Sequence, residues 1–362
     1  MKILFITNSD IGNTTYGGGK ASAARFALLK QFGSVTVYPV VKQSNKASII
    51  SLLQGNYPPL RNDIIREVLD MCKKNQYDII YADTSVCGTL IKELKKGGIK
   101  TPILSHFQNC ESDFNAIRFG RSNSPKSTIY HKLVRREEKL TLRYSDCCAA
   151  LSDRDAHRLK ELYGKKTDVL LPLFLKDEVL DLDIESADRK RNKYCLLFGP
   201  VLYPNVEGFR WFLKNVSPYI KIKTVIAGKG FEEYQDEFQR EFVQVTGFVK
   251  DIQSLYQNAA CVCIPLFHGC GMKIKTAEAL MYGKTVFGTD EAFSGFQFDI
   301  DKAGGICNQA EEYIHRINSF LEREHNFYNV YSREIYQKKY SETSAMKRYR
   351  AVFKRLCQSI EK

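Results

Sequence analysis

The stretch HGCGMKIKTAEALMYGK, residues 268–284, combines the residue types that suit anion binding. It follows the apolar run CVCIPL, so the pattern predicts a buried strand, a glycine-rich loop and a helix that begins near Lys273 or Thr276. Free amide N–H groups and the helix dipole attract phosphate to such an end. Lys273 and Lys275 stand where a helix disfavours cations, which a bound diphosphate would explain, and Glu278 is placed to accept hydrogen bonds from a vicinal diol such as ribose. The alternative is a solvated helix face with surface lysines.

A second glycine-rich stretch, YGGGKAS at residues 16–22, follows the first predicted strand and opens a helix. It is not a P-loop, because Lys20 is followed by Ala21 and Thr14 stands where the first glycine would be. It is not a dinucleotide fingerprint either, since the glycines are contiguous and the next strand ends without a carboxylate. We expect a loop that a ligand approaches closely, rather than a tight turn alone, at Gly17, Gly18 and Gly19.

The chain has 362 residues, 44% hydrophobic and 26% charged, which predicts two soluble α/β domains. Strand and helix patterns alternate with short connections in both halves, as in doubly wound parallel sheets. We place an N-terminal Rossmann-like domain at 1–175, a charged linker at 176–193 and a C-terminal Rossmann-like domain at 194–330. Residues 331–362 read as terminal helices that pack back on the N-terminal domain. Ligands of two such domains are expected in a cleft between the C-terminal ends of their strands.

Eleven scattered cysteines make a disulfide framework improbable and favour a reducing cytoplasm. Cys261 and Cys263 alternate in one strand pattern and so share a face, for which we expect core packing rather than metal binding. Two D-x-D triplets, at 181–183 and 299–301, do not follow an apolar strand that would hold a metal rigidly. We therefore expect no metal in the functional site and no cofactor.

The net charge of +13 favours an acidic partner. Residues 116–143 and 347–362 interleave cations with apolar residues in roughly helical order, as in a helix that docks on an anionic membrane or packs between domains. A solvated basic face is the alternative, and no motif supports binding of nucleic acid. The start, MKILFITNSD, predicts a first strand and not a signal peptide, and no run is long enough to span a bilayer.

Several blocks together resemble the group 1, family 4-like, retaining glycosyltransferases of the GT-B fold. In the C-terminal half these are FGPVLYPNVEGFRWFLKNVSP, VIAGKG, VTGFVKDIQSLYQNAACVCIPL, GCGMKIKTAEALMYGKTVFGT and FSGF. In the N-terminal half YGGGKA, HFQNCESDF and REEKLTLRYSDCCAALSDRDAHRLKELYG resemble the acceptor domain of those enzymes. The resemblance extends from the first strand to about residue 300, and its C-terminal block is the specific part.

The resemblance implies metal-independent transfer of a hexose, with retention at the anomeric carbon, from a nucleotide diphosphate sugar. Glu278 would hold the ribose, Lys275 would neutralise the diphosphate, and His106 would lie near the donor sugar. Lysines and helix dipoles would stabilise the leaving diphosphate in place of a metal. The further residues expected to contact the donor are Gly17, Gly18, Gly19, Gly199, Gly247, Phe248, Val249, His268, Gly269, Cys270, Gly271, Met272 and Lys273.

The sequence departs from the family pattern at three places. Cys270 stands eight positions before Glu278, where relatives often carry a second glutamate, so the loop backbone or His268 would recognise the sugar instead. FGPVLYPN lacks the arginine that many members place after this strand, which puts more of the phosphate binding on the lysines. Gln108 takes the place of His106 in one alignment of SHFQNCE.

The sequence thus predicts a glycosyltransferase that acts on a saccharide or lipid-linked acceptor in cell-surface polysaccharide synthesis. We expect it in the cytoplasm, peripheral on the inner face of the plasma membrane. The rival predictions are an NAD-dependent oxidoreductase, disfavoured by the missing fingerprint, and a non-catalytic nucleotide-sugar-binding protein of the same fold.

Overall fold

The computed structural model describes residues 1–12, 17–40, 44–119, 125–179, 193–323 and 327–358. The chain divides into two compact units, one formed by Met1–Pro172 and Ala345–Lys362 and the other by Leu173–Ser344. The predicted linker 176–193 and the triplet at 181–183 fall largely or wholly outside the described residues.

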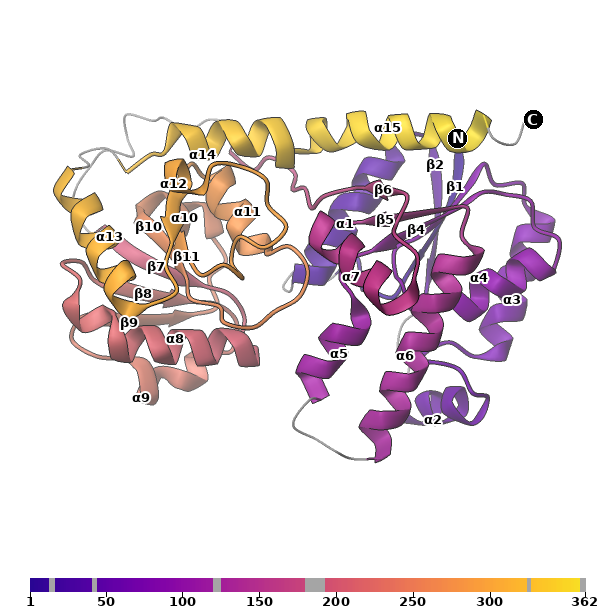
Figure 1. The fold of residues 1–362 in the computed structure, drawn as a ribbon, viewed down its shortest axis with the longest axis horizontal. Helices are drawn as coiled ribbons and strands as arrows, with labels where there is room; N and C mark the ends of the chain where they lie inside the picture. Colours follow the sequence, from indigo (N-terminus) through magenta and orange to yellow (C-terminus); the bar gives the residue numbers. More distant parts are fainter. Residues whose placement is uncertain (13–16, 41–43, 120–124, 180–192, 324–326, 359–362) are drawn as a thin grey trace. The chain divides into compact units, whose positions relative to one another are not determined.

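The first unit is built on a six-stranded parallel sheet of order β2-β1-β3-β4-β5-β6, with helices on both faces (Figure 1). Its strands are β1 (Lys2–Thr7), β2 (Ser34–Pro39), β3 (Ile79–Ala82), β4 (Ile103–Phe107), β5 (Cys147–Ala150) and β6 (Val169–Leu170). Its helices are α1 (Gly17–Lys30), α2 (Asn45–Leu53), α3 (Asn62–Lys74), α4 (Gly88–Lys96), α5 (Glu111–Phe119), α6 (Pro125–Tyr144) and α7 (Asp153–Tyr163). Most of helix α15 (Glu342–Gln358) completes the unit.

Both faces of the first sheet are buried, which explains why its central strands are continuously apolar. Leu4 and Ile6 pack with the apolar side chains of α3 and α4 on one face. Phe5 points to the other face, where its ring meets Phe26 of α1 and Tyr81. Because successive side chains of a strand alternate between faces, this division follows from the period of two.

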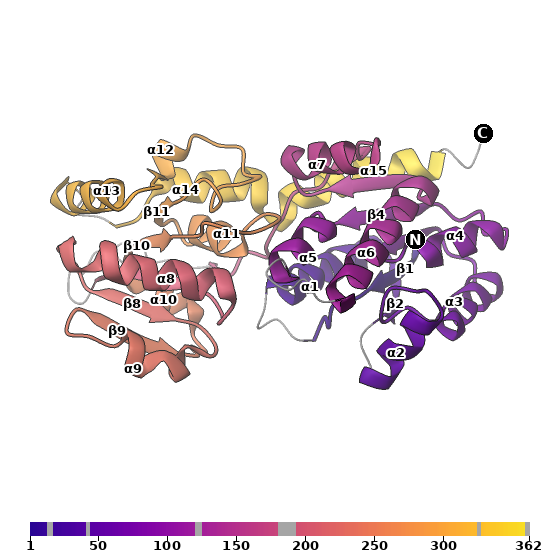
Figure 2. The ribbon, with the colours of Figure 1, turned by 60° about the horizontal axis from the view of Figure 1, so that its bottom comes forward.

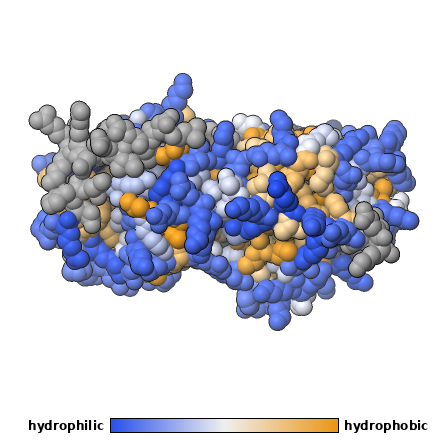
Figure 3. Space-filling view, turned by 90° about the horizontal axis from the view of Figure 1, so that it is seen from above, coloured by the Kyte–Doolittle hydropathy of each residue, from blue (hydrophilic) through white to orange (hydrophobic). Residues whose placement is uncertain are grey.

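Helix α15 lies on the same face as α1. The Phe353 ring contacts Phe32 with centroids 5.0 Å apart, and Tyr349 stacks on Tyr81 at 6.1 Å. Lys347, Arg350 and Lys354 of this helix are exposed. Seen from above, hydrophilic side chains lie along α15, beside an apolar area over the first unit (Figure 3). The apolar face of this basic helix is thus covered by its own unit, as is expected for a terminal helix that returns to the N-terminal domain.

The second unit has a six-stranded parallel sheet of order β12-β11-β10-β7-β8-β9 (Figure 2). Its strands are β7 (Tyr194–Phe198), β8 (Thr224–Ala227), β9 (Val243–Gly247), β10 (Ala259–Ile264), β11 (Thr285–Gly288) and β12 (Gly304–Ile306). Its helices are α8 (Tyr203–Asn215), α9 (Gln235–Phe238), α10 (Ile252–Asn258), α11 (Ile274–Met281), α12 (Ile300–Ala303), α13 (Ala310–Arg323) and α14 (Val330–Ile335), with short 3₁₀ helices η2 (Ser217–Tyr219) and η3 (Phe231–Tyr234) and the π-helical turn η4 (Tyr336–Tyr340).

The terminal helices divide between the units differently from the expectation that 331–362 forms one segment. Helix α14 belongs to the second unit, where Arg333 forms a two-pronged ion pair with Asp177 at 2.7 and 2.9 Å and donates to the carbonyl of Met281. The two Rossmann-like sheets confirm the predicted α/β fold class. Within the described residues, no helix is both long and apolar enough to cross a membrane.

Candidate active site

Four loops meet at the carboxyl edge of the second sheet, after β7, β8, β9 and β10. The N–H of Gly228 donates to the carbonyl of Gly247 at 2.7 Å, and a Cβ at Gly228 would lie 1.8 Å from the Gly199 carbonyl oxygen. The loops after β7, β8 and β9 are therefore packed backbone against backbone, an approach that only glycine permits. Ligands of open parallel sheets bind at this edge.

Lys275, in the first turn of α11, reaches across to the loop after β7. Its Nζ donates a 2.7 Å hydrogen bond to Oδ1 of Asn205 and lies 5.4 Å from the centre of the Phe209 ring. A Cβ on Gly199 would come within 3.0 Å of the same Nζ. The structure thus brings together two predicted residues, Lys275 and Gly199, from segments 76 positions apart in the chain.

The ammonium of Lys275 loses its proton more readily than that of an ordinary lysine. Burial lowers the pKa of its ammonium to about 7; Glu278 opposes the shift and Lys273 adds to it. Its hydrogen-bond partner Asn205 is a neutral amide, which supplies no charge to hold the proton. An anion at this position would provide the missing charge.

Asn205 was missed by the sequence analysis. It is 5% exposed, and its amide Nδ2 donates to the carbonyl of Pro200 at 2.7 Å while Oδ1 accepts from Lys275. One side chain therefore fixes both the β7 loop and the lysine. The available signal was a polar residue in the first turn of a helix whose neighbours are mostly apolar, directly after a glycine loop.

Lys273 is hydrogen-bonded to the backbone of its own loop. Its Nζ donates to the carbonyls of Cys270 at 3.2 Å and Gly271 at 2.7 Å, and pairs with Glu291 at 2.7 Å. Both side chains of the ion pair are at most 15% exposed. The phosphate contact predicted for Lys273 stays a prediction, but these bonds give the ammonium a structural role, and its partner Glu291 was not found from the sequence.

Glu278 lies inside α11 rather than on a solvated face. It is 4% exposed and accepts a hydrogen bond from the hydroxyl of Tyr256 at 3.3 Å. The Tyr256 ring stacks on Tyr282 with centroids 4.7 Å apart, which fixes the position of the hydroxyl that donates this hydrogen bond. The alternative of a solvated surface glutamate is therefore wrong.

The remaining residues of the predicted donor loop differ in exposure. His268 is exposed, and its Nε2 lies 4.0 Å from a carboxylate oxygen of Glu207. Met272 is buried. Gly271 has φ +63°, a conformation that favours glycine and turns the chain into α11. The partly buried members are Gly269 and Cys270.

The turn after β9 also lies at this edge. Gly247 has φ +63°, and a Cβ there would approach Oε2 of Glu232 to 2.7 Å. Phe248 is 59% exposed and Val249 is partly buried. An exposed phenyl ring beside a glycine turn is compatible with the predicted contact to a base.

In the first unit, Gly17, Gly18 and Gly19 form the start of α1, where the predicted glycine loop lies. Behind them is a buried ion pair, with Nε of Arg25 2.5 Å from Oδ1 of Asp83. The hydroxyl of Ser22 donates to the other carboxylate oxygen of Asp83 at 2.5 Å. The additional partners of this network are Thr7 and Gln108.

The structure does not support the predicted role of His106. The side chain is 1% exposed, its Nδ1 lies 2.6 Å from the Tyr81 hydroxyl and its Nε2 3.1 Å from the Leu171 carbonyl oxygen. Burial lowers the pKa of His106 well below its usual value, and Arg25 adds to this shift. The reason is alternation along β4, which turns this position into the core beneath α15. Gln108, the other candidate, is partly buried just after β4.

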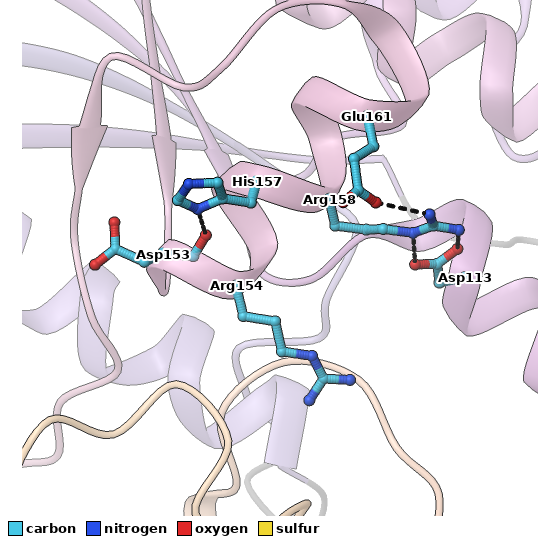
Figure 4. A pocket seen from close by; sticks show the side chains of 6 residues that line it. All are labelled: Asp113, Asp153, Arg154, His157, Arg158 and Glu161. Carbon is cyan, nitrogen blue, oxygen red and sulfur yellow. Dashed lines mark hydrogen bonds and ion pairs between the residues drawn. The ribbon is translucent and has the colours of Figure 1, made fainter.

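A shallow surface pocket lies between α5 and α7, outside the predicted site (Figure 4). Arg158 pairs there with Asp113 at 2.6 Å and with Glu161 at 3.0 Å, and His157 lies 2.7 Å from the Asp153 carbonyl oxygen. These charges largely satisfy one another, so the pocket offers little to an ionic ligand.

Both carboxylates of the acidic triplet 299–301 lie near basic side chains of the same unit. Asp299 lies 3.6 Å from Lys302, and Asp301 lies 3.1 Å from Arg316. Among the described residues these two do not form part of a cluster with metal-ligand spacing.

One family model matches part of the second unit. Residues 192–323 match the family model for glycosyl transferases group 1. A search of curated proteins finds no match.

Solved structures match the whole chain at low identity. Sucrose-phosphate synthase from Thermosynechococcus elongatus has a TM-score of 0.73 at 13% identity, covering 99% of both chains. Anabaena HepE in complex with UDP and glucose has a TM-score of 0.66 at 14% identity, covering 98% of this chain and 99% of its own. The lipopolysaccharide outer core galactosyltransferase WaaB has a TM-score of 0.65 at 14% identity, covering 98% and 100%. Residues 192–323 are therefore identified as a group 1 glycosyltransferase region, in a chain that has the GT-B fold.

Proposed function

We propose that the protein is a glycosyltransferase that moves a sugar from a nucleotide diphosphate sugar to an acceptor hydroxyl. The observation that carries the proposal is the meeting of Gly199, Asn205 and Lys275 at the carboxyl edge of the second sheet. All three lie inside the region that matches the family model, and HepE, which shares the fold, has been solved with UDP and with UDP-glucose.

The chemistry assigned to this edge is binding and charge stabilisation. Lys275 would take the charge of the diphosphate as the glycosidic bond breaks, because a preorganised cation stabilises a leaving group without having to reorient. Glu278 would accept hydrogen bonds from the ribose diol. The exposed ring of Phe248 would lie against the base.

A panel of nucleotide sugars tests the proposal. Each donor is incubated with the full chain, and release of its nucleoside diphosphate is measured with and without a mixture of saccharide acceptors. We expect release from at least one donor and none in the Lys275→Met variant. Hydride transfer to NAD would support the oxidoreductase instead, and donor binding without turnover would support a non-catalytic protein.

We further propose that transfer proceeds with retention and without a metal at the lysine site, as the family resemblance implies. Proton NMR of the first product formed distinguishes the two anomers. Activity should persist in the presence of EDTA. An inverted product would overturn retention, and strong inhibition by EDTA would overturn metal independence.

The acceptor is proposed to be a saccharide or lipid-linked saccharide of cell-surface polysaccharide synthesis, reached from the cytoplasmic face of the membrane. Exposed apolar side chains support a membrane contact in the first unit, with Ile49 57%, Leu53 82% and Ile129 51% exposed. The Tyr57 and Tyr130 rings, 6.0 Å apart, hold the segment after α2 against α6. The apolar surface formed by Ile49, Leu53 and Ile129 lies on α2 and α6, and the same two helices carry the exposed cations Lys46, Lys132 and Arg135.

Only part of the two predicted basic segments suits such a contact. Helix α15 has its apolar side chains buried, so residues 347–358 offer the membrane cations alone. Residues 120–124 and 359–362 lie outside the described residues.

Co-sedimentation with vesicles of phosphatidylglycerol and of phosphatidylcholine tests the membrane proposal. We expect binding to the anionic vesicles that weakens with salt and is reduced in Leu53→Asp. Val330→Asp, which changes an equally apolar exposed residue of the second unit, is the matched control. Equal binding of both variants, or binding that ignores lipid charge, would overturn this surface.

A further inference from the structure

Three cysteines from two neighbouring strands converge in the core of the second unit. Cys195 of β7 is paired in register with Cys261 of β10, and Cys263 follows two positions along the same face. Their sulfur atoms all lie within 4.8 Å of one another, and those of Cys195 and Cys263 are 3.3 Å apart. Within the described part of the chain, no other group of three His, Cys, Asp or Glu side chains has this metal-ligand spacing.

The sequence alone placed Cys261 and Cys263 on one face and predicted core packing. What it could not show is the third thiol, because Cys195 is contributed by a strand 66 positions earlier in the chain. All three are at most 1% exposed, and α8 and α13 cover them with apolar side chains.

A fourth polar side chain lies in the same core. The Tyr313 hydroxyl of α13 is fully buried and has no hydrogen-bond partner among the described residues. Tyr313 belongs to the same core cluster as the three cysteines. A buried hydroxyl without a partner costs about 1–3 kcal/mol, a cost that contact with a bound ligand would remove.

A buried cation lies on the neighbouring segment. Lys284 is 2% exposed, and its Nζ donates to the carbonyls of Gln257 at 3.2 Å, Ala259 at 3.0 Å and Phe327 at 3.4 Å. Ala259 is the first residue of β10, two positions before Cys261. Burial lowers the pKa of Lys284 to about 7, and its Nζ lies at the start of the strand that carries Cys261 and Cys263.

We propose that Cys195, Cys261 and Cys263 bind a thiophilic divalent metal ion of the zinc class, with the Tyr313 oxygen as fourth ligand. Zinc–thiolate bonds of about 2.3 Å require sulfur separations of roughly 3.8–4.0 Å, so the sulfurs need move by only about 1 Å. Binding forms three metal–sulfur bonds and releases the three thiol protons to solvent. The resulting single negative charge would favour the protonated form of Lys284.

Such an ion would be structural. A closed site with all positions filled by protein leaves none for substrate, which distinguishes it from a catalytic centre. It would tie β7 to β10, the strands whose ends carry Gly199 and the loop 268–273. Because the site is enclosed, the ion would enter during folding, and EDTA added to the folded protein would leave it in place.

The experiment measures metal directly and does not depend on activity. The full chain is produced in minimal medium supplied with Zn²⁺ or with Co²⁺, passed through chelating resin, and analysed by elemental mass spectrometry. We expect about one ion per chain. The cobalt form should show thiolate-to-metal charge-transfer bands and the intense d–d bands of a four-coordinate ion. Cys195→Ala, Cys261→Ala and Cys263→Ala should each lose most of the metal, whereas Cys72→Ala, a buried cysteine of the first unit, should keep it.

Tyr313→Phe gives a second test in a variant that keeps the core volume. If the hydroxyl is a ligand, the variant purified in the same way should retain less than half of the wild-type metal content and change the cobalt d–d bands. Metal binding unchanged in Tyr313→Phe would remove the fourth ligand. Three results would overturn the proposal. The wild-type protein could contain no metal, or the metal could persist in all three cysteine variants. The third is a metal-free protein whose mass is lower by the two hydrogens lost on forming a disulfide.

Discussion

The Nζ of Lys275 donates a hydrogen bond of 2.7 Å to Oδ1 of Asn205, and this pair joins the first turns of α11 and α8. The partner is neutral, and burial lowers the pKa of Lys275 to about 7. Near neutral pH the lysine therefore gains or loses its charge easily. A bound anion would favour the protonated state.

The affinity for a nucleoside diphosphate should fall as the pH rises above 7. Below this pH Lys275 is already protonated in the free protein; above it, binding must take up a proton, which lowers affinity by up to about tenfold per pH unit until the pKa of the bound state is passed. Calorimetric titration with UDP between about pH 7 and pH 9 measures this slope. This range lies above the phosphate ionisation near pH 6.

Lys275→Met is the control for that slope. It should bind UDP more weakly at all pH values and show no fall over this range. A slope that persists in Lys275→Met would assign the titration to another group.

Asn205→Asp should move the pH dependence upward. A carboxylate at hydrogen-bond distance from Nζ raises the pKa of the lysine, so the fall in affinity should begin at least one pH unit higher than in the wild type. Overall affinity should decrease, because the new negative charge opposes the diphosphate. Asn205→Leu, which supplies no charge, should leave the midpoint near 7; an unchanged midpoint in Asn205→Asp would contradict the pairing.

Glu278→Gln tests the ribose contact. The wild type should prefer UDP to 2′-deoxy-UDP and 3′-deoxy-UDP by tenfold or more, since a hydrogen bond to a charged acceptor contributes about 1.5–3 kcal/mol. The glutamine variant should lose most of this preference while keeping the side-chain shape. Tyr256→Phe removes the 3.3 Å hydrogen bond to the carboxylate and is the matched control for loss of that support. Equal discrimination in Glu278→Gln would exclude the ribose role.

Gly199→Ala should impair binding more than stability. Gly199 has φ +149°, and the new Cβ would lie 2.8 Å from Nδ2 of Asn205 and 3.0 Å from Nζ of Lys275. The methyl group would push both side chains out of place, and backbone strain would add roughly 1–2 kcal/mol to the cost of folding. UDP binding and urea denaturation, measured on the same preparation, separate the two effects. Affinity that survives the substitution would show that the pair is not part of the donor site.

Lys273 and Glu291 should act together on stability. Either Lys273→Met or Glu291→Gln leaves a largely buried charge without its partner, so each should lower the free energy of unfolding by about 1–3 kcal/mol. The double variant should cost clearly less than the sum of the two. Urea denaturation of the four proteins completes the double-mutant cycle. Full additivity would mean that the ion pair contributes nothing.

The repeating pattern of apolar strands and amphipathic helices was sufficient to predict two parallel sheets, because burial on both faces leaves a continuous signal in the sequence. The glycine loop and helix around Lys275 could be predicted for the same local reason. His106 was misjudged because one position of register decides whether a strand residue faces the core or the strand end, and its neighbours do not reveal which. Asn205 and Glu291 could not be found, since each acquires its role only through a partner elsewhere in the chain.

The fold class, the glycine-rich helix start and the place of Lys275 and Glu278 on one short helix could be read from the amino-acid pattern. These are local properties, set by spacing along the backbone. The folded chain was needed to show that Asn205 contacts Lys275, that the apolar face of α15 is covered, and that Cys195 lies beside Cys261 and Cys263. Such contacts depend on the order of strands in a sheet, which brings distant segments together and is not written in any single stretch of residues.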